Sequence, residues 1–381
     1  MTFLHEGVFS ESMEGGDEKN SEIKKVGIIG DGRFAEAIAY LISKINKDVE
    51  VVLWAHKEGR ERDGKQGDTF RHAEGVPLSK NVRITHNAEE VISGADVLFS
   101  VVPTQHMRKV FEREDIKGLI QKNWKSIKAI ISGTKGFEIG TNKRPSEVLQ
   151  EILGNEKIDI LEKLGVLSGL NFSEEILNDV PMGTNIVSKN EAVQKIATEL
   201  LAQEGFDVFP KTDVCKAEVF GALKNVISIV TGAAKGLNYE DEEIDKLIEA
   251  GVSEINRFAI AFGIDHEPLN KNDYTMLDLV GTAKSSQSRN FQTGFTFVTQ
   301  DKKEGMGVSE GVETVKSVIA LAKEKNIKMP ICEAVYEMVE NKKDISQIVK
   351  DLLEKLEVLK RASQMKGAKE KKKKKNGERE K

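Results

Sequence analysis

Residues 24–35 read KKVGIIGDGRFA and join a short apolar strand to a helix through a glycine turn. Gly30 permits the tight turn, and Gly32 lets the backbone come close to a ligand at the first turn of the helix, which continues to Ile45. The pattern G-x-G-x-x-A between a strand and a helix is typical of a dinucleotide site, where a pyrophosphate binds at the helix N-terminus. A glycine turn without a ligand is the alternative interpretation.

Strands and helices alternate from this turn onward, which predicts an α/β fold with a mostly parallel sheet and helices on both faces. After about residue 213 the strand signal fades and helical spacing remains. We therefore expect a Rossmann-like dinucleotide-binding domain at 23–212, followed by an all-helical substrate-binding domain at 213–362. The expected strands are 24–29, 49–54, 96–102, 127–132, 165–168, 184–188 and 206–209, and the expected helices are 35–45, 88–94, 191–203, 219–230, 241–259, 311–325 and 331–341.

The second expected strand ends without the acidic residue that usually binds the ribose 2′-hydroxyl of NAD. Trp54, Ala55, His56 and Lys57 stand there instead. His56, Lys57 or Arg60 would suit a 2′-phosphate, so the choice between NAD and NADP stays open.

One helix is apolar on every side except for Lys224 and Asn225. Residues 219–230 read VFGALKNVISIV, and a helix of that composition is buried all round. A lysine is rarely buried unless a group pairs with it or needs it. We expect Lys224 to face a ligand in a cleft; a lysine whose stem is packed while its ammonium reaches water is the alternative.

Two further polar segments are candidates for the same site. Lys135 lies between glycines just past an expected strand, where open α/β sheets bind ligands, although an ordinary loop lysine fits equally well. Residues 277–290 read LDLVGTAKSSQSRN and are expected to form a loop; the residues that could converge there are Asp278, Thr282, Arg289 and Asn290. Arginine binds phosphate with two parallel hydrogen bonds. A capped surface loop is the alternative for this segment.

Composition narrows the class of protein. The chain of 381 residues is 39% apolar, carries a net charge of −5 and has two cysteines, Cys215 and Cys332, which provide neither a disulfide framework nor a metal site. Residues 366–381 carry nine Lys or Arg against three Glu, so the remainder of the chain is acidic. It therefore offers no general positive electrostatic field that would attract nucleic acid. We expect disordered ends at 1–22 and 363–381, with the basic tail solvated or touching an anionic surface, and no apolar run long enough to span a bilayer.

Several segments, in the same order along the chain, resemble the NAD(P)-dependent glycerol-3-phosphate dehydrogenase family, closer to its bacterial-type branch. The resemblance covers roughly residues 24–360. Its departures are Ala35 in place of a third glycine and Leu170 in place of a proline. The matching segments are 30–35 GDGRFA, 53–56 LWAH, 101–103 VVP, 134–136 TKG, 168–173 SGLNFS, 221–226 GALKNV, 278–290 and 309–311 SEG.

The resemblance implies roles for individual residues. The catalytic residues would be Lys224 as proton acceptor, Lys135, Asp278 and Thr282. The substrate-binding residues would be Lys135, Gly169, Asn171, Asn225, Asp278, Ser288, Arg289 and Asn290. The cofactor-binding residues would be Gly30, Gly32, Arg33, Phe34, His56, Lys135, Ser173, Arg289, Val308 and Glu310. No metal site is expected.

The implied reaction is hydride transfer between glycerol 3-phosphate and dihydroxyacetone phosphate with NAD(H) or NADP(H), in a cytoplasmic homodimer that links glycolysis to glycerol and phospholipid metabolism. A ketopantoate reductase or 6-phosphogluconate dehydrogenase type would also use a lysine–asparagine pair, but the cluster from Asp278 to Asn290 argues against it. A non-catalytic dinucleotide sensor would keep the glycine turn without needing Lys224.

Overall fold

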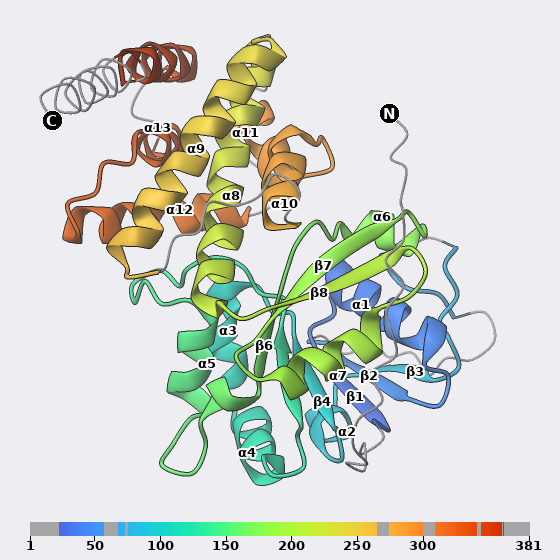
Figure 1. The fold of residues 1–381 in the computed structure, drawn as a ribbon. Helices are drawn as coiled ribbons and strands as arrows, with labels where there is room; N and C mark the ends of the chain where they lie inside the picture. The colour runs from blue at the N-terminus through green and yellow to red at the C-terminus, as the bar shows by residue number, and fades with distance from the viewer. Residues whose placement is uncertain are drawn as a thin grey trace, which may run out of the picture.

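A computed structural model describes residues 23–56, 68–72, 75–264, 274–299, 309–340, 344–359 and 361. Figure 1 shows a sheet covered by helices and, beside it, a group of helices around α8. This arrangement confirms the expected α/β class. The predictions for residues 1–22 and 363–381, and those for Lys57, Arg60 and Val308, lie outside the described residues.

The sheet has eight strands in the order β3-β2-β1-β4-β5-β6-β7-β8, and every pairing is parallel except the antiparallel pair β6–β7. Because most strands run in one direction, the segments that follow β1, β4, β5 and β6 emerge at one edge of the sheet. Strand β3 was not expected from the sequence. The strands are β1 Lys25–Ile29, β2 Glu50–Trp54, β3 Val82–Thr85, β4 Val97–Ser100, β5 Ala129–Ser132, β6 Leu164–Ser168, β7 Met182–Val187 and β8 Phe206–Lys211.

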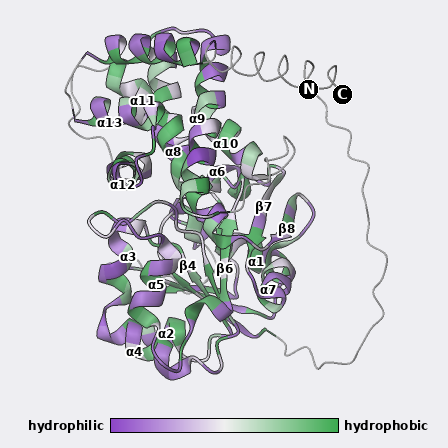
Figure 2. Cartoon of the chain, turned by 60° about the vertical axis from the view of Figure 1, so that its left-hand side comes forward, coloured by the Kyte–Doolittle hydropathy of each residue, from purple (hydrophilic) through white to green (hydrophobic). Residues whose placement is uncertain are grey.

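Helices cover both faces of the sheet. Apolar side chains of α1, α6 and α7 pack with one face, and those of α2, α3, α4 and α5 pack with the other. The hydropathy colouring in Figure 2 marks many residues of helices such as α3 and α5 as hydrophilic. The helices are α1 Arg33–Ile45, α2 Ala88–Ile92, α3 Thr104–Phe111, α4 Glu114–Asn123, α5 Pro145–Leu153, α6 Ser173–Leu177 and α7 Glu191–Leu201, with a 3-10 helix η1 at Ile160–Lys163.

The second half is helical and packs around α8. Helices α9, α10, α11, α12 and α13 all contact α8 or its neighbours, and residues 345–359 are helical as well. The helices are α8 Val214–Gly236, α9 Asp241–Ala261, α10 Tyr274–Lys284, α11 Arg289–Thr299, α12 Glu310–Glu324 and α13 Pro330–Val339.

By length and composition alone α8 would suffice to cross a membrane. Its most apolar window is, however, wholly buried inside the protein. An apolar helix surrounded by other helices is the core of this half, so its hydrophobicity is explained by packing.

Helices α8 and α11 meet backbone to backbone. A Cβ atom built on Gly232 of α8 would lie 2.0 Å from the carbonyl oxygen of Phe291, and one built on Gly294 of α11 would lie 1.8 Å from that of Ile229. No side chain fits at either position, so these two glycines set the spacing between the two helices.

The expectation of a loop from residue 277 to residue 290 is wrong. Asp278 and Thr282 lie one turn apart on α10, Arg289 opens α11, and only residues 285–288 connect the two helices. Small and polar residues favour loops in general, but here the polar face of α10 is buried against α8, and this tertiary contact overrides the local preference.

Candidate active site

Lys224 is buried in a polar cluster between α8 and α10. Its ammonium donates hydrogen bonds to the carboxylate of Asp278 and, at 3.1 Å, to the hydroxyl of Thr282, which in turn donates to Asp278 Oδ1 at 3.2 Å. The exposed fractions of the three residues are 5%, 2% and 3%. Lys224 therefore does not reach bulk water, and the alternative of an ammonium extending to the surface is wrong.

The surroundings of Lys224 favour its neutral form. Burial is the main cause that lowers the pKa of Lys224, to about 8, and the positive charge of Lys135 acts in the same direction. Asp278 opposes both effects because a carboxylate stabilises the ammonium. An amine with a pKa near 8 is neutral in part near pH 7, which is what a proton acceptor requires.

Lys135 reaches the same carboxylate from the loop that follows β5. Its Nζ lies 3.8 Å from Asp278 Oδ2 and 3.4 Å from Asn171 Oδ1. The Lys135 stem runs along α8 at Gly221, where a Cβ atom would lie 3.7 Å from Lys135 Cγ. Two lysines thus face one aspartate, and the sequence-based candidates Lys135, Asn171, Lys224 and Asp278 are brought together.

Asn171 is itself held by a residue that the sequence did not single out. Its amide donates to Thr184 Oγ1 on β7 at 3.2 Å. Gly169 lies directly against the same strand, because a Cβ there would be 2.8 Å from Thr184 Cα. The strand pairing of β6 with β7 therefore orients Asn171, and no local signal in the sequence reveals this.

The next turns of α8 hold the connection between α10 and α11. Ser228 Oγ donates to the carbonyl oxygen of Thr282 at 2.7 Å and shares a hydrogen bond of 3.1 Å with Ser288 Oγ. Ser228 lies four residues after Lys224, on the same face of the helix. That spacing was visible in the sequence and would have identified it.

Asn225 and Asn290 meet the start of α12. Asn225 donates to Glu310 Oε2 at 3.2 Å, and Asn290 Oδ1 accepts a hydrogen bond of 2.9 Å from the backbone N–H of Gly311. Ser309, which precedes α12, has a buried hydroxyl with no hydrogen-bond partner among the described residues. The start of α12 therefore lies beside two predicted site residues.

Other predicted residues lie outside this cluster. Arg289 is exposed, and no ion pair joins its guanidinium to the described residues. Arg33 pairs with Glu174, next to Ser173, at 3.4 Å. His56 is exposed and meets Trp54 edge-on, with the ring centroids 5.7 Å apart. Among the described residues, no hydrogen bond or ion pair joins Arg289, Arg33 or His56 to Lys224.

The turn after β1 suits a dinucleotide phosphate. Gly30 has a φ of +139°, which favours glycine, and Gly32 is the N-cap of α1 without any side-chain cap. No heavy atom lies within 4 Å of a Cβ built on Gly32, so the backbone there is open to a ligand. Phe34 packs against Gly133, which follows β5. The residues present therefore fit a nicotinamide dinucleotide whose pyrophosphate binds at the N-terminus of α1.

Within the described ranges, no group of three or more His, Cys, Asp or Glu side chains is arranged to hold a metal ion.

Models of two family domains match the chain. The N-terminal domain of NAD-dependent glycerol-3-phosphate dehydrogenase matches residues 25–194, and the C-terminal domain of the same family matches residues 213–350. A glycerol-3-phosphate dehydrogenase [NAD(P)+] from Ligilactobacillus salivarius is 34% identical over 345 residues, which are 87% of this chain and 97% of the relative. One from Staphylococcus aureus is 31% identical over 337 residues, with 87% and 98% covered.

Solved structures agree in fold. Glycerol-3-phosphate dehydrogenase from Coxiella burnetii superposes with a TM-score of 0.76 at 25% identity, covering 87% of this chain and 99% of the other. The enzyme from Saccharomyces cerevisiae does so with a TM-score of 0.68 at 23% identity, covering 87% and 100%.

The fold and these matches define an oxidoreductase that uses a nicotinamide dinucleotide, NAD or NADP. The chain belongs to the NAD-dependent glycerol-3-phosphate dehydrogenase family, as its motifs indicate. The resemblance to the bacterial-type branch and the expected enzyme class are confirmed, and the ketopantoate, 6-phosphogluconate and sensor alternatives are not favoured.

Proposed function

We propose that Lys224 is the proton acceptor of a glycerol-3-phosphate dehydrogenase that interconverts sn-glycerol 3-phosphate and dihydroxyacetone phosphate. The observation that supports it is the buried Lys224, whose pKa is lowered to about 8 and whose ammonium contacts Asp278 and Thr282. When bound, the nicotinamide supplies the hydride acceptor at C4. The C2 hydroxyl proton of the substrate goes to Lys224 Nζ as the hydride leaves C2, so charge and atoms balance.

The surrounding residues have separate tasks in this proposal. Lys135 is placed to stabilise the developing alkoxide at C2 because its ammonium lies near Asp278 and Asn171. Asp278 and Thr282 hold Lys224 in position. Arg289 binds the substrate phosphate, which its exposed guanidinium suits without first breaking an ion pair to the described residues.

The remaining predicted residues divide between the substrate and the dinucleotide. In this proposal Gly169, Asn171, Asn225, Ser288 and Asn290 line the substrate side. The dinucleotide is bound by Gly30, Gly32, Arg33, Phe34, His56, Ser173, Val308 and Glu310, with Lys135 and Arg289 near both ligands. The open N-terminus of α1 and the unpartnered Ser309 hydroxyl support this assignment.

The test measures oxidation of NADH and of NADPH by the full chain with dihydroxyacetone phosphate or ketopantoate. In the reverse direction it measures reduction of NAD+ and NADP+ with glycerol 3-phosphate or 6-phosphogluconate. We expect turnover only with dihydroxyacetone phosphate and glycerol 3-phosphate. Equal turnover with ketopantoate would contradict the proposed substrate.

Domain limits, assembly and cellular role complete the proposal. We assign residues 23–212 to dinucleotide binding and residues 213–362 to substrate binding, which the change from sheet to helices at α8 supports. The two free cysteines fit a reducing compartment such as the cytoplasm. The homodimer, and a place between carbohydrate metabolism and phospholipid biosynthesis, are supported by the family resemblance, and light scattering of the full chain tests the dimer.

A further inference from the structure

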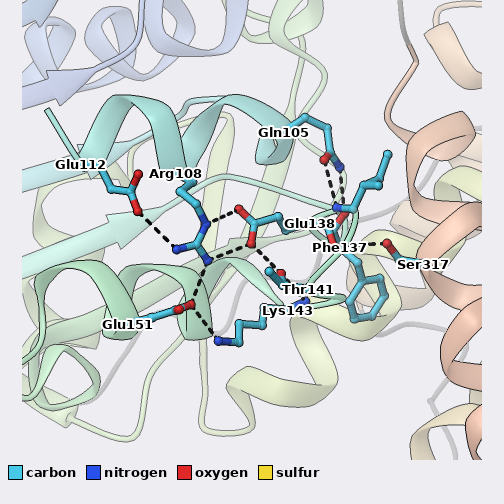
Figure 3. A network of polar contacts seen from close by, with 10 residues as sticks. Gln105, Arg108, Glu112, Phe137, Glu138, Thr141, Lys143, Glu151 and Ser317 are labelled. Carbon is cyan, nitrogen blue, oxygen red and sulfur yellow. Dashed lines mark hydrogen bonds and ion pairs between the residues drawn. The ribbon is translucent and has the colours of Figure 1, made fainter.

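The loop that carries Lys135 is held along its length by helix α3. Thr104 Oγ1 donates to the carbonyl oxygen of Lys135 at 2.6 Å. Gln105 donates to the carbonyl oxygen of Phe137 at 2.8 Å and accepts from the N–H of Ile139 at 3.1 Å (Figure 3). Two successive side chains of one helix thus bind the backbone at alternate residues of the loop.

One turn further along α3, Arg108 binds the side chain of a loop residue, Glu138. Its Nε and Nη2 each lie 2.9 Å from an oxygen of Glu138, a bidentate pair that Figure 3 shows at the centre of the network. Thr141 donates to the same carboxylate at 2.5 Å. Partial burial opposes the charge of Glu138, but the hydrogen bonds from Arg108 and Thr141 outweigh it and hold the pKa of Glu138 below its usual value.

The opposite side of the loop is anchored in the helical half. Phe137 is buried in the core around α8 and meets the ring of Phe258 edge-on, with the centroids 6.1 Å apart. Ser317 on α12 donates to the carbonyl oxygen of Glu138 at 3.3 Å. The loop is therefore clamped between the sheet half and the helical half.

An exposed ion pair contributes little to stability, which is the plain alternative for Arg108 and Glu138. This pair differs in three respects. It is bidentate, the Glu138 side chain is only 10% exposed, and Glu138 lies three residues from Lys135 on the same loop. The pair therefore fixes the position of the loop that brings the Lys135 ammonium to Asp278, beside Lys224.

We propose that Arg108 and Glu138 are positioning residues for the reaction: they hold the loop so that Lys135 stays beside Asp278 and opposite Lys224. The inference rests on the proposed roles of Lys135 and Lys224. Neither residue of the pair touches the reacting atoms.

The pKa of Lys224 offers a second measurement. It depends on the charges around Lys224 and would not change if Arg108 and Glu138 only stabilised the fold. The charged groups that act on Lys224 are Asp278 from α10, Lys135 from the loop and Glu310 from α12. Lys135 lowers the pKa of Lys224, whereas both carboxylates raise it. When the loop is released and Lys135 moves away, the pKa of the proton acceptor rises.

The experiment compares Arg108→Gln, Glu138→Gln and the double variant with the native enzyme. We expect kcat to fall about tenfold to a hundredfold, as for a small misplacement of a reacting group, and the coenzyme KM to change less than about threefold. The pH midpoint of kcat/KM for glycerol 3-phosphate should move upward. The double variant should be little worse than either single one because both remove the same contact.

Two further variants calibrate the result. Lys135→Met should also raise the pH midpoint of kcat/KM. Because it removes the Lys135 charge altogether, its shift is the largest that the loop variants can produce. Glu151→Gln removes another carboxylate from Arg108, at 2.8 Å, and the exposed ion pair with Lys143, at 2.7 Å, but leaves the Arg108–Glu138 contact intact, so its kcat should stay within about twofold of native. If Arg108→Gln fails to fold, Gln105→Ala, which removes two loop hydrogen bonds, tests the same point with a smaller loss.

The outcomes separate the two proposals. If Lys135→Met keeps its turnover, the proposed role of Lys135 fails. If Lys135→Met loses turnover while the Arg108 and Glu138 variants keep kcat within twofold, only the positioning inference fails. Loss of kcat in those variants without an upward shift of the pH midpoint also overturns it, because a general loss of stability would act in that way.

Discussion

The glycine turn at Gly30–Gly32 and the cluster around Lys224 differ in burial and in how many parts of the chain form them. The turn is open and local, since backbone angles and the absence of side chains make it suitable for phosphate. The cluster is buried, and its members come from α8, α10 and the loop after β5. A local site of backbone groups tolerates changes in nearby side chains, whereas a buried set of charges depends on every partner.

The sharpest test of this contrast is Lys224→Met. We expect kcat to fall by about a thousandfold or more, within the range for loss of an acid–base group, while coenzyme still binds at the glycine turn. Stopped-flow turnover and coenzyme fluorescence titration measure the two effects. Lys235→Met, on the exposed last turn of the same helix, is the matched control and should retain turnover. Near-native kcat in Lys224→Met would remove Lys224 from the chemistry.

The next largest effect is expected for the phosphate. Arg289→Lys keeps the charge but loses the planar fork, so kcat/KM for glycerol 3-phosphate should fall by more than about a hundredfold, near 2.7 kcal/mol. Glycerol should be a comparably poor substrate of the native enzyme. Lys284→Met is the control, since Lys284 is engaged with Asp245 at 2.5 Å and should have little effect. Should Arg289→Lys remain within a few-fold of native while Lys284→Met is impaired, Lys284 holds the phosphate.

A smaller effect is expected on the pH profile. With a pKa of Lys224 of about 8, kcat/KM for alcohol oxidation should rise with pH, reach half of its plateau at about pH 8 and level off above that, because only the neutral amine accepts the proton. Asp278 raises the pKa of Lys224, so Asp278→Asn should lower the midpoint. Initial rates between pH 6 and 10 measure both. A midpoint that stays fixed in Asp278→Asn would separate the observed titration from Lys224.

The smallest effect is expected at the open dinucleotide site. Because β2 ends in Trp54, Ala55 and His56 without an acid, NADH and NADPH should both support reduction, with kcat/KM values less than about a thousandfold apart, some 4 kcal/mol. His56→Ala should change that ratio by less than about tenfold, because the His56 side chain is exposed. A ratio of kcat/KM for NADH and NADPH beyond about a thousandfold in the native enzyme would contradict a site that accepts both the 2′-hydroxyl and the 2′-phosphate.

The two regions also differ in how far the sequence alone predicts them. The glycine turn is written in consecutive residues, so its position and the flanking strand were predicted closely. Lys224 was identified because a lysine in an apolar helix conflicts with its surroundings. Its partner Asp278 was singled out in the polar segment 277–290 and matched the family's motif. It was assigned to a loop, however, because the helix that carries it becomes stable only through burial against α8.

Residues that act only through long-range contacts left no signal. Thr184 matters because β7 pairs antiparallel to β6 and faces Asn171, and Arg108 matters because α3 lies along the Lys135 loop. Neither relation follows from spacing along the chain, because thirteen residues separate Thr184 from Asn171 and thirty separate Arg108 from Glu138.

The contact between α8 and α11 has a consequence for regioselectivity. Gly232 and Gly294 let the two backbones touch, which fixes how far the start of α11, with Arg289, stands from the turn of α8 that carries Lys224. In the proposed mechanism Arg289 holds the phosphate and Lys224 accepts the proton, so this distance would select which carbon of the substrate lies beside Lys224. On that proposal, the absence of side chains at Gly232 and Gly294 helps to determine that C2 is oxidised rather than C1.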